Sequence, residues 1–461
     1  MKPINTSKLP PGPKPKIPFG NLFNFRRNSL EFLKKIARQY GDIVYFRTGP
    51  LRIVYLNHPD FIKEVLSVQH SNFVKGRPLE IAKELLGEGL LTSEGEFHKR
   101  QSRIIQPAFH RKMIESYVPA MTEYTVRLMS DWEDGMKVDM MKEMIKLSTG
   151  IAGKTMFSVD VEKEAPEINR ALDSIMSLFG RITLPGSEWL LKLPLPGNFR
   201  FFKAKARLDD TIYRIINDRR RNSLNNGDLL SLLLQAQAEA GGDSGMTDQQ
   251  IRDEALTLFL TAFDTTSLAL TWTWYLLSQH PEVEAELHKE LDTVLQGRIP
   301  ALEDYPRLKF TRMVFAESMR LYPPIYIIAR QAIEDFTIDG YTVPGGTIVL
   351  MSPYLIHRDA RFHQNPGAFN PHSWAEPAGG QLSRYEYFPF SMGPRSCIGQ
   401  NYAWMEGVLV LACIAQFWRI NLAPGHRVEL AQLLNLRPKY GMMMQLSRRK
   451  QGDRFIKNET I

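Results

Sequence analysis

The segment Phe390-Ser-Met-Gly393-Pro-Arg395-Ser-Cys397-Ile-Gly399 leads directly into an apolar, periodic run from Asn401 to Phe417. A cysteine is therefore expected at the N-terminal end of a helix, where the helix dipole favours the thiolate form. The two glycines let the backbone bend and lie close to a flat group that side chains would keep away. Because a thiolate binds metals and Arg395 supplies a positive charge, the segment predicts a metal site beside an anionic cofactor.

A single cysteine is usually a small buried apolar residue, so Cys397 alone would carry little weight. The complete pattern F-x-x-G-x-R-x-C-x-G, however, resembles the axial-ligand loop of the cytochrome P-450 superfamily, the haem-thiolate monooxygenases. The resemblance implies haem b (iron protoporphyrin IX) as the cofactor and Cys397 as the ligand of its iron. It also implies that Phe390 lies against the porphyrin, that Arg395 binds a propionate, and that Gly399 belongs to the cofactor-binding loop.

The 461 residues are 43% apolar and 23% charged, which is typical of a globular protein. Length alone would suggest about three domains, but no linker divides the chain, so a single domain is expected over residues 1–461, with a Pro-rich segment at residues 1–20. The resemblance implies a mainly α fold with a small β-rich lobe (α+β) and a long central helix over the haem. Two cysteines cannot form a disulfide framework, which favours a reducing compartment; core packing is expected for Cys413.

The net charge of +8 raises the question of nucleic acid, but no basic block interleaved with aromatic residues supports it. The N-terminal residues contain no apolar run of the ~20 residues that a membrane span requires. The resemblance therefore favours a soluble, prokaryotic type of the family, cytoplasmic and monomeric, without a membrane anchor.

A long helix is predicted from the capping-box spacing Thr247-Asp-Gln-Gln250 to Gln279. Its centre holds the polar cluster Thr261-Ala-Phe-Asp264-Thr265-Thr266 between apolar turns. One interpretation is structural, with Asp264 in a salt bridge and the hydroxyls bonded to carbonyls one turn earlier. The resemblance implies instead that Asp264 and Thr265 relay protons at the distal haem face, although Thr261 and Ala262 replace the usual small residue and glycine.

Two other segments resemble propionate-binding positions of the family. In the helix that contains Phe97-His98-Lys99-Arg100, His98 matches the family pattern, but Ser102 stands where a second basic residue is usual. Arg100 or Arg103 is a candidate replacement. Farther along, the resemblance implies that Arg330 also holds a propionate; otherwise it is an ordinary charge at a strand end.

Glu317 and Arg320 are three residues apart and so share a helix face. The resemblance implies that this pair is buried beside the haem loop and joined by an arginine from an F-x-P-x-R segment. Here Ser373 stands in place of that arginine. Either His372, Arg384 or another base completes the network, or other contacts hold this region.

Apolar segments that resemble the family's substrate pocket favour a lipophilic substrate, such as a fatty acid or a terpenoid. The irregular segment 178–202 resembles a lid over the substrate channel. The predicted pocket residues are Leu260, Thr261 and Ala262 on the long helix, Ile325, Ile327 and Ile328 after Pro324, and Met442 near the C-terminus.

The resemblance implies a monooxygenase that hydroxylates or epoxidises its substrate with one atom of O2. No Gly-rich dinucleotide loop is evident, so electrons are expected from NAD(P)H through a ferredoxin or flavodoxin and its reductase. Two alternatives stay open. One is a peroxide-driven or isomerising haem-thiolate enzyme, and the other is a haem-binding sensor without an enzymatic reaction.

Overall fold

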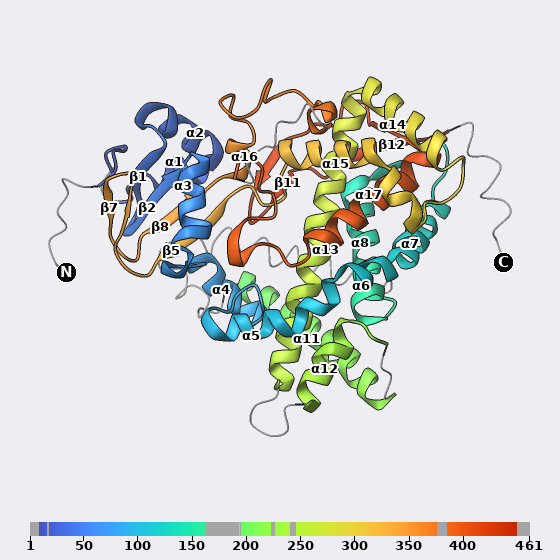
Figure 1. Ribbon diagram of the computed structural model, residues 1–461, viewed down its shortest axis with the longest axis horizontal. Coiled ribbons are helices and arrows are strands. Elements are labelled where there is room, and N and C mark those ends of the chain that lie inside the picture. The colour runs from blue at the N-terminus through green and yellow to red at the C-terminus, as the bar shows by residue number, and fades with distance from the viewer. Residues whose placement is uncertain are drawn as a thin grey trace.

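Helix α13 (Asp248–Gln279) runs through the middle of the molecule, with other elements arranged around it (Figure 1). The computed structural model describes residues 9–15, 18–161, 193, 195–222, 226–239, 246–375 and 385–449. The predicted capping box is confirmed: the Thr247 hydroxyl accepts from the Gln250 amide at 3.2 Å, and the Thr247 amide donates to the Gln250 side chain at 3.0 Å. The helix therefore begins where the sequence predicts.

The helical part surrounds α13. Its other helices are α4 (Arg77–Leu86), α5 (Gly95–Ile105), α6 (Arg111–Ser116), α7 (Val118–Ser130), α8 (Met140–Phe157), α11 (Pro196–Arg221), α12 (Leu229–Glu239), α14 (Pro281–Val294), α15 (Lys309–Leu321) and α17 (Gln400–Phe417). Helices α1 (Leu22–Arg27), α2 (Ser29–Tyr40), α3 (Pro59–Lys63) and α16 (Pro353–Ile356) accompany the strand-rich lobe. Most of the segment predicted as a lid, residues 178–192 and 194, lies outside the described residues.

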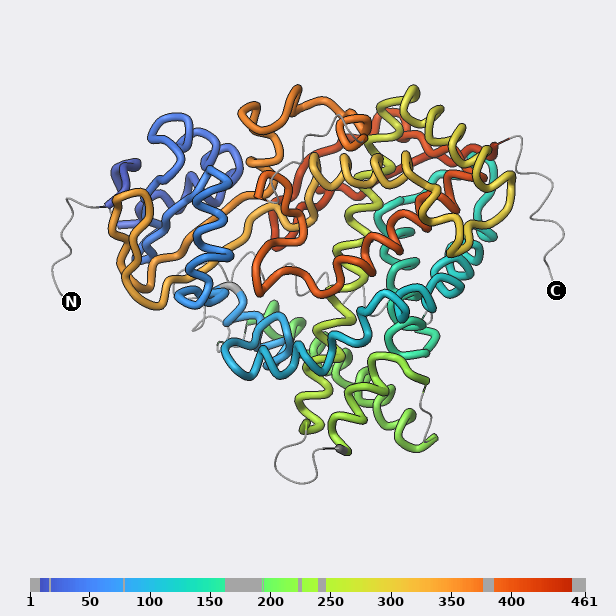
Figure 2. The backbone as a smooth tube through the Cα atoms, in the orientation of Figure 1, coloured from blue at the N-terminus to red at the C-terminus, as the bar shows by residue number. Residues whose placement is uncertain are grey.

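A five-stranded sheet forms the lobe on the left of Figure 1, in the order β1-β2-β8-β5-β3. Figure 2 shows how the orange segment returns to lie beside the blue N-terminal strands, where β2 and β8 pair in parallel. Strands β1 and β2 pair antiparallel as a hairpin. The strands of this sheet are β1 (Ile43–Thr48), β2 (Leu51–Leu56), β3 (Phe73–Val74), β5 (Ile328–Ala332) and β8 (Ile348–Met351).

Three smaller sheets complete the strand content. They comprise β4 (Lys137–Asp139) with β12 (Met443–Arg448) and β9 (Trp418–Leu422), β6 (Phe336–Ile338) with β7 (Tyr341–Val343), and β10 (Leu430–Gln432) with β11 (Leu436–Pro438).

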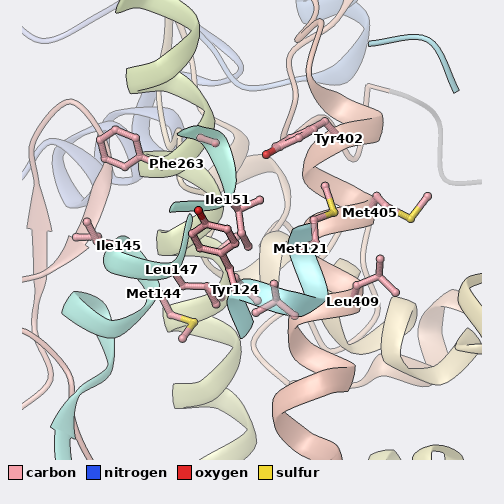
Figure 3. Packing of buried hydrophobic residues seen from close by; sticks show 14 of the residues in the cluster. Met121, Tyr124, Met144, Ile145, Leu147, Ile151, Phe263, Tyr402, Met405 and Leu409 are labelled. Carbon is pink, nitrogen blue, oxygen red and sulfur yellow. The ribbon is translucent and has the colours of Figure 1, made fainter. Parts of the chain in front are cut away.

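The main hydrophobic core lies where α7, α8, α13 and α17 pack together (Figure 3). The helices approach closely because glycines face aromatic rings: a Cβ at Gly150 would strike Tyr124, and one at Gly407 would strike Phe315. Cys413 is fully buried in this core, as predicted, and burial raises the pKa of its thiol.

Glu317 and Arg320 form the expected buried ion pair on α15, with Nε–Oε2 and Nη2–Oε1 distances of 2.8 and 2.7 Å. The guanidinium also donates to the carbonyls of His357, Pro366 and Ala368. No base occupies the place of the missing arginine among the described residues. Instead, the Trp374 indole and the Asn370 amide each donate to Glu317 at 2.9 Å.

Of the two named bases, the one that the structure describes does not join this network. His372 instead contacts Glu286 at the surface, and Arg384 lies outside the described residues. An indole N–H and a backbone N–H supply the hydrogen bonds, so the Glu317 carboxylate needs no second cation. Among the described residues, these contacts rather than another base hold this region.

Trp374→Phe is expected to lower the free energy of unfolding by about 1–3 kcal/mol, because a buried carboxylate oxygen loses one of its two donors. The measurement is denaturant unfolding of the purified protein. Ser373→Ala is the matched control: that side chain is exposed and bonds only to the Asn370 carbonyl, so its effect should stay within about 0.5 kcal/mol. Equal effects of the two variants would contradict the role of Trp374.

Candidate functional site

The Cys397 loop is closed by its own backbone, because the Cys397 amide donates to the Phe390 carbonyl at 2.9 Å. Gly393 has φ +71°, and a Cβ there would overlap the carbonyl oxygen of Leu66. The loop is thus pressed against the turn at Glu64–Val68, and only glycine fits at this contact. Helix α17 begins at Gln400, directly after Gly399.

The Cys397 side chain is exposed, yet surrounding protein raises the pKa of its thiol through desolvation. The Gly399 amide and Lys75 act in the opposite direction and favour the thiolate. A sulfur that is both accessible and desolvated faces a space inside the protein. This is the environment in which a bound cation would complete the ionisation of the thiol.

The middle of α13 has an open face. Between Ile251 and Phe263 every residue is buried except Thr261 and Ala262, and one turn further Thr265 is also only partly buried. These positions share one side of the helix, since residues three and four apart are neighbours. The three predicted residues therefore line a gap in otherwise continuous packing.

Four basic side chains gather near Cys397. Burial and the neighbouring Arg395 lower the pKa of Arg330 to about 10, and burial with Arg395 and Lys75 lowers the pKa of His98 to about 4. Burial, Arg395 and Arg330 likewise lower the pKa of Lys75 to about 7. Glu94, which lies 3.2 Å from Arg395, is the carboxylate that acts in the opposite direction on Lys75 and Arg330, and the Cys397 thiol does so on Lys75.

Lys75 is the functional candidate that sequence reasoning missed. Its ammonium donates to the Leu91 carbonyl at 2.9 Å, and its amide donates to Glu94 at 2.8 Å. Arg100 and Arg103, the candidate replacements at this position, have exposed side chains. Sequence motifs gave no reason to single out Lys75, because it directly follows β3 and lies outside every segment that resembles a propionate-binding motif.

The acid and alcohol residues of α13 have defined partners. The Thr265 hydroxyl donates to the Thr261 carbonyl at 3.0 Å, and the Thr261 hydroxyl donates to the Thr257 carbonyl at 2.8 Å. Asp264 is buried and forms an ion pair with Arg437. The contacts expected from the structural interpretation are therefore present, and they leave Thr265 on the open face.

The predicted pocket residues divide into two groups. Thr261, Ala262, Ile325 and Ile327 are partly buried, so each keeps some accessible surface. The others belong to the hydrophobic cores, because their side chains are almost wholly enclosed: Leu260, Ile328 and Met442.

The assignment of Met442 to the pocket is wrong. Its side chain has no exposed surface, and its amide donates to Asp139 of β4 at 2.9 Å. The methionines that follow begin strand β12, which lies between β4 and β9 in its sheet.

The site fits an anionic, metal-containing cofactor. The Nε atom of Arg395 is buried without a hydrogen-bond partner among the described residues, and the basic cluster outnumbers its carboxylates. No group of three or more His, Cys, Asp or Glu side chains that could hold a metal occurs in the described part of the chain. A metal at Cys397 would take its remaining ligands from a macrocycle, and a haem with two propionates meets both requirements.

Among the described residues, no helix has both the length and the apolar character needed to cross a bilayer.

Comparison with known proteins identifies the family. The Cytochrome P450 family profile matches residues 10–445. A solved structure described as retinoic acid-bound cyanobacterial CYP120A1 superposes with a TM-score of 0.85 at 23% identity, covering 96% of this chain and 99% of that chain. This likeness shows the mainly α fold with a β-rich lobe.

Sequence relatives agree. The chain is 38% identical to cyclooctatin synthase of Streptomyces melanosporofaciens, over 89% of each chain. It is 35% identical to cyclooctat-9-en-7-ol 5-monooxygenase of the same organism, over 91% of each, and 32% identical to pentalenene oxygenase of Streptomyces avermitilis, over 96% of this chain and 97% of that one. The chain therefore belongs to the cytochrome P450 family, whose members carry haem and act as monooxygenases.

Proposed function

We propose that this P450 monooxygenase oxidises a terpenoid, with Cys397 as the haem ligand. The proposal rests mainly on two of the relatives, because cyclooctat-9-en-7-ol and pentalenene, which their names give, are cyclic terpenoids. The accessible, desolvated Cys397 sulfur is the observation in this chain that supports the ligand assignment. Fatty acids remain the other lipophilic class to test.

The basic cluster would hold the propionates of the haem. Arg330 and Lys75 come from the side of the five-stranded sheet, whereas His98 and Arg395 come from α5 and the Cys397 loop. Charge-assisted hydrogen bonds to carboxylates are the strong ones, and here the protein offers few competing carboxylates. When bound, the haem supplies the O2 activation, in which a thiolate ligand favours O–O cleavage.

Thr265 and Asp264 would relay protons at the distal face of the haem. Thr265 presents its hydroxyl at the open face of α13, where Oγ1 can accept a proton from one partner and donate its own to another. The Thr261 carbonyl orients this hydroxyl. Asp264 would pass protons to Thr265 and take up one from solvent for each that it gives, because the paired carboxylate holds none of its own.

A cyclic hydrocarbon would lie against the accessible apolar side chains Ala262, Ile325 and Ile327. Binding to these side chains would depend on the apolar area that is buried and not on directed hydrogen bonds. Electrons would come from NAD(P)H through a ferredoxin or flavodoxin and its reductase. The monomeric state, the cytoplasmic location and the single domain over residues 1–461 stay predictions.

Substrate titration tests this proposal. The oxidised, haem-loaded protein is titrated with cyclic terpenoids, fatty acids and steroids while the Soret band is recorded, and a saturable low-to-high-spin shift is expected with terpenoids. Cys397→Ser is the control, since loss of the thiolate should abolish both this response and the thiolate spectrum of the ferrous carbonyl complex. A shift with fatty acids alone would contradict the substrate class.

Turnover with a surrogate ferredoxin and reductase separates the alternatives. Oxygen-dependent product with NAD(P)H supports the monooxygenase. Product formed only from added hydrogen peroxide would favour the peroxide-driven enzyme, and ligand binding without any turnover would favour the sensor.

Thr265→Ala is expected to lower the product formed per NAD(P)H about tenfold or more and to release peroxide, because a positioned proton donor contributes about 10²–10⁴-fold. Product, NAD(P)H and peroxide are measured together. Thr266→Ala is the matched control: its hydroxyl bonds to the Ala262 carbonyl, but the residue is buried away from the open face. Unchanged coupling in Thr265→Ala would remove Thr265 from the relay.

Lys75→Met is expected to speed haem loss about tenfold, since one charge-assisted bond to a propionate contributes about 1.5–3 kcal/mol. The rate is measured by transfer of haem to an excess of apomyoglobin. Lys83→Met, on the partly exposed face of α4, is the control and should leave the rate unchanged. Equal rates in both variants would exclude Lys75 as a cofactor ligand.

A further inference from the structure

The β10–β11 hairpin reaches Asp264 with two side chains that no sequence motif singled out. The Asn435 amide and the Arg437 guanidinium donate to different oxygens of the Asp264 carboxylate. Arg437 Nε also donates to Asn435 Oδ1 at 2.8 Å, so the three side chains form a closed group. Asp264, Asn435 and Arg437 are only 7%, 1% and 6% exposed, so these hydrogen bonds are shielded from solvent.

The hairpin is itself fixed to the rest of the molecule. The Trp272 indole, two turns after Asp264 on α13, donates to the Leu436 carbonyl at 2.9 Å. The Leu436 amide donates to the Pro324 carbonyl at 2.9 Å, and the Tyr326 hydroxyl donates to the Leu433 carbonyl at 2.9 Å. Asn435 and Arg437 are therefore held in place by neighbours on both sides.

This arrangement turns Asp264 away from the open face. Asp264 is buried against the hairpin, whereas its neighbour Thr265 is partly accessible. A buried carboxylate needs an opposite charge and satisfied hydrogen bonds, and Arg437 carries a permanent positive charge. The carboxylate consequently has a set orientation, and proton supply to Thr265 starts from that orientation.

We propose that Asn435 and Arg437 are positioning residues for Asp264 in proton delivery. The inference rests on the proposed monooxygenase function. The β10–β11 hairpin, together with α13, would then determine how much product forms per NAD(P)H consumed.

Coupling measurements test the inference. Arg437→Met and Asn435→Ala are expected to lower the product formed per NAD(P)H several-fold and to raise the solvent deuterium isotope effect on turnover, because proton transfer becomes slower. Arg437→Lys should recover part of both values by restoring the charge. Lys439→Met, which removes an exposed charge from the same hairpin, is the matched control and should behave as the unsubstituted protein.

The readouts separate positioning from a structural role. A loss of folded protein alone would lower the yield of haem-loaded enzyme but leave the isotope effect of the remaining enzyme unchanged. Unchanged coupling and isotope effect in Arg437→Met and Asn435→Ala, in protein that still uncouples on Thr265→Ala, would overturn the inference and leave the proposed function intact. No oxygen-dependent product from the unsubstituted protein would instead contradict the proposed function.

A thermal-unfolding cycle tests the contact without turnover. Arg437→Met should lower the unfolding midpoint of the haem-loaded protein, because it leaves a buried carboxylate without its cation. The double variant Asp264→Asn with Arg437→Met should recover part of that loss. Strictly additive effects of the two substitutions would show that the pair is not coupled and would also overturn the inference.

Discussion

Positive charge beside Cys397 is the constraint on which the cofactor site depends. Burial and the charge of Arg395 lower the pKa of Lys75, His98 and Arg330, and Glu94 offsets only part of the positive charge. Gathering unpaired cations in the interior is costly unless an anion joins them. These charges lie next to the accessible sulfur of Cys397. A macrocycle with two carboxylates would offset the free-energy cost of burying them there.

Buried negative charges around the site need donors in the same way that the buried positive charges need an anion. Glu317 and Asp264 are buried carboxylates, and each accepts hydrogen bonds from donors that include residues far away in the sequence. For Glu317 these donors include an indole and a backbone amide, which replace the expected arginine. Buried polar groups can thus keep their hydrogen bonds while the residue types that supply them change.

What the sequence predicted well was local. The Cys397 loop, the capping box at Thr247 and the Glu317–Arg320 pair are each defined by a few neighbouring residues whose spacing sets their geometry. What it missed depends on contacts between distant segments. Lys75, Trp374 and Arg437 meet their partners only after folding. Met442 was predicted in the pocket because its contact with Asp139 of β4 cannot be seen in the sequence. The acid and alcohol of α13 lie between these cases, because their kinds of contact were predicted, whereas Asn435 and Arg437 as the partners of Asp264 were not.

The contact between Gly393 and Leu66 joins the Cys397 loop to the N-terminal lobe. Haem ligands would likewise come from both parts: Lys75 and Arg330 from the sheet side, and Cys397, His98 and Arg395 from the helical side. A ligand that binds only the assembled protein stabilises it by mass action. The cofactor would therefore join the strand-rich lobe to the helical part, and a larger supply of haem in the cell would increase how much of this protein accumulates in its folded form.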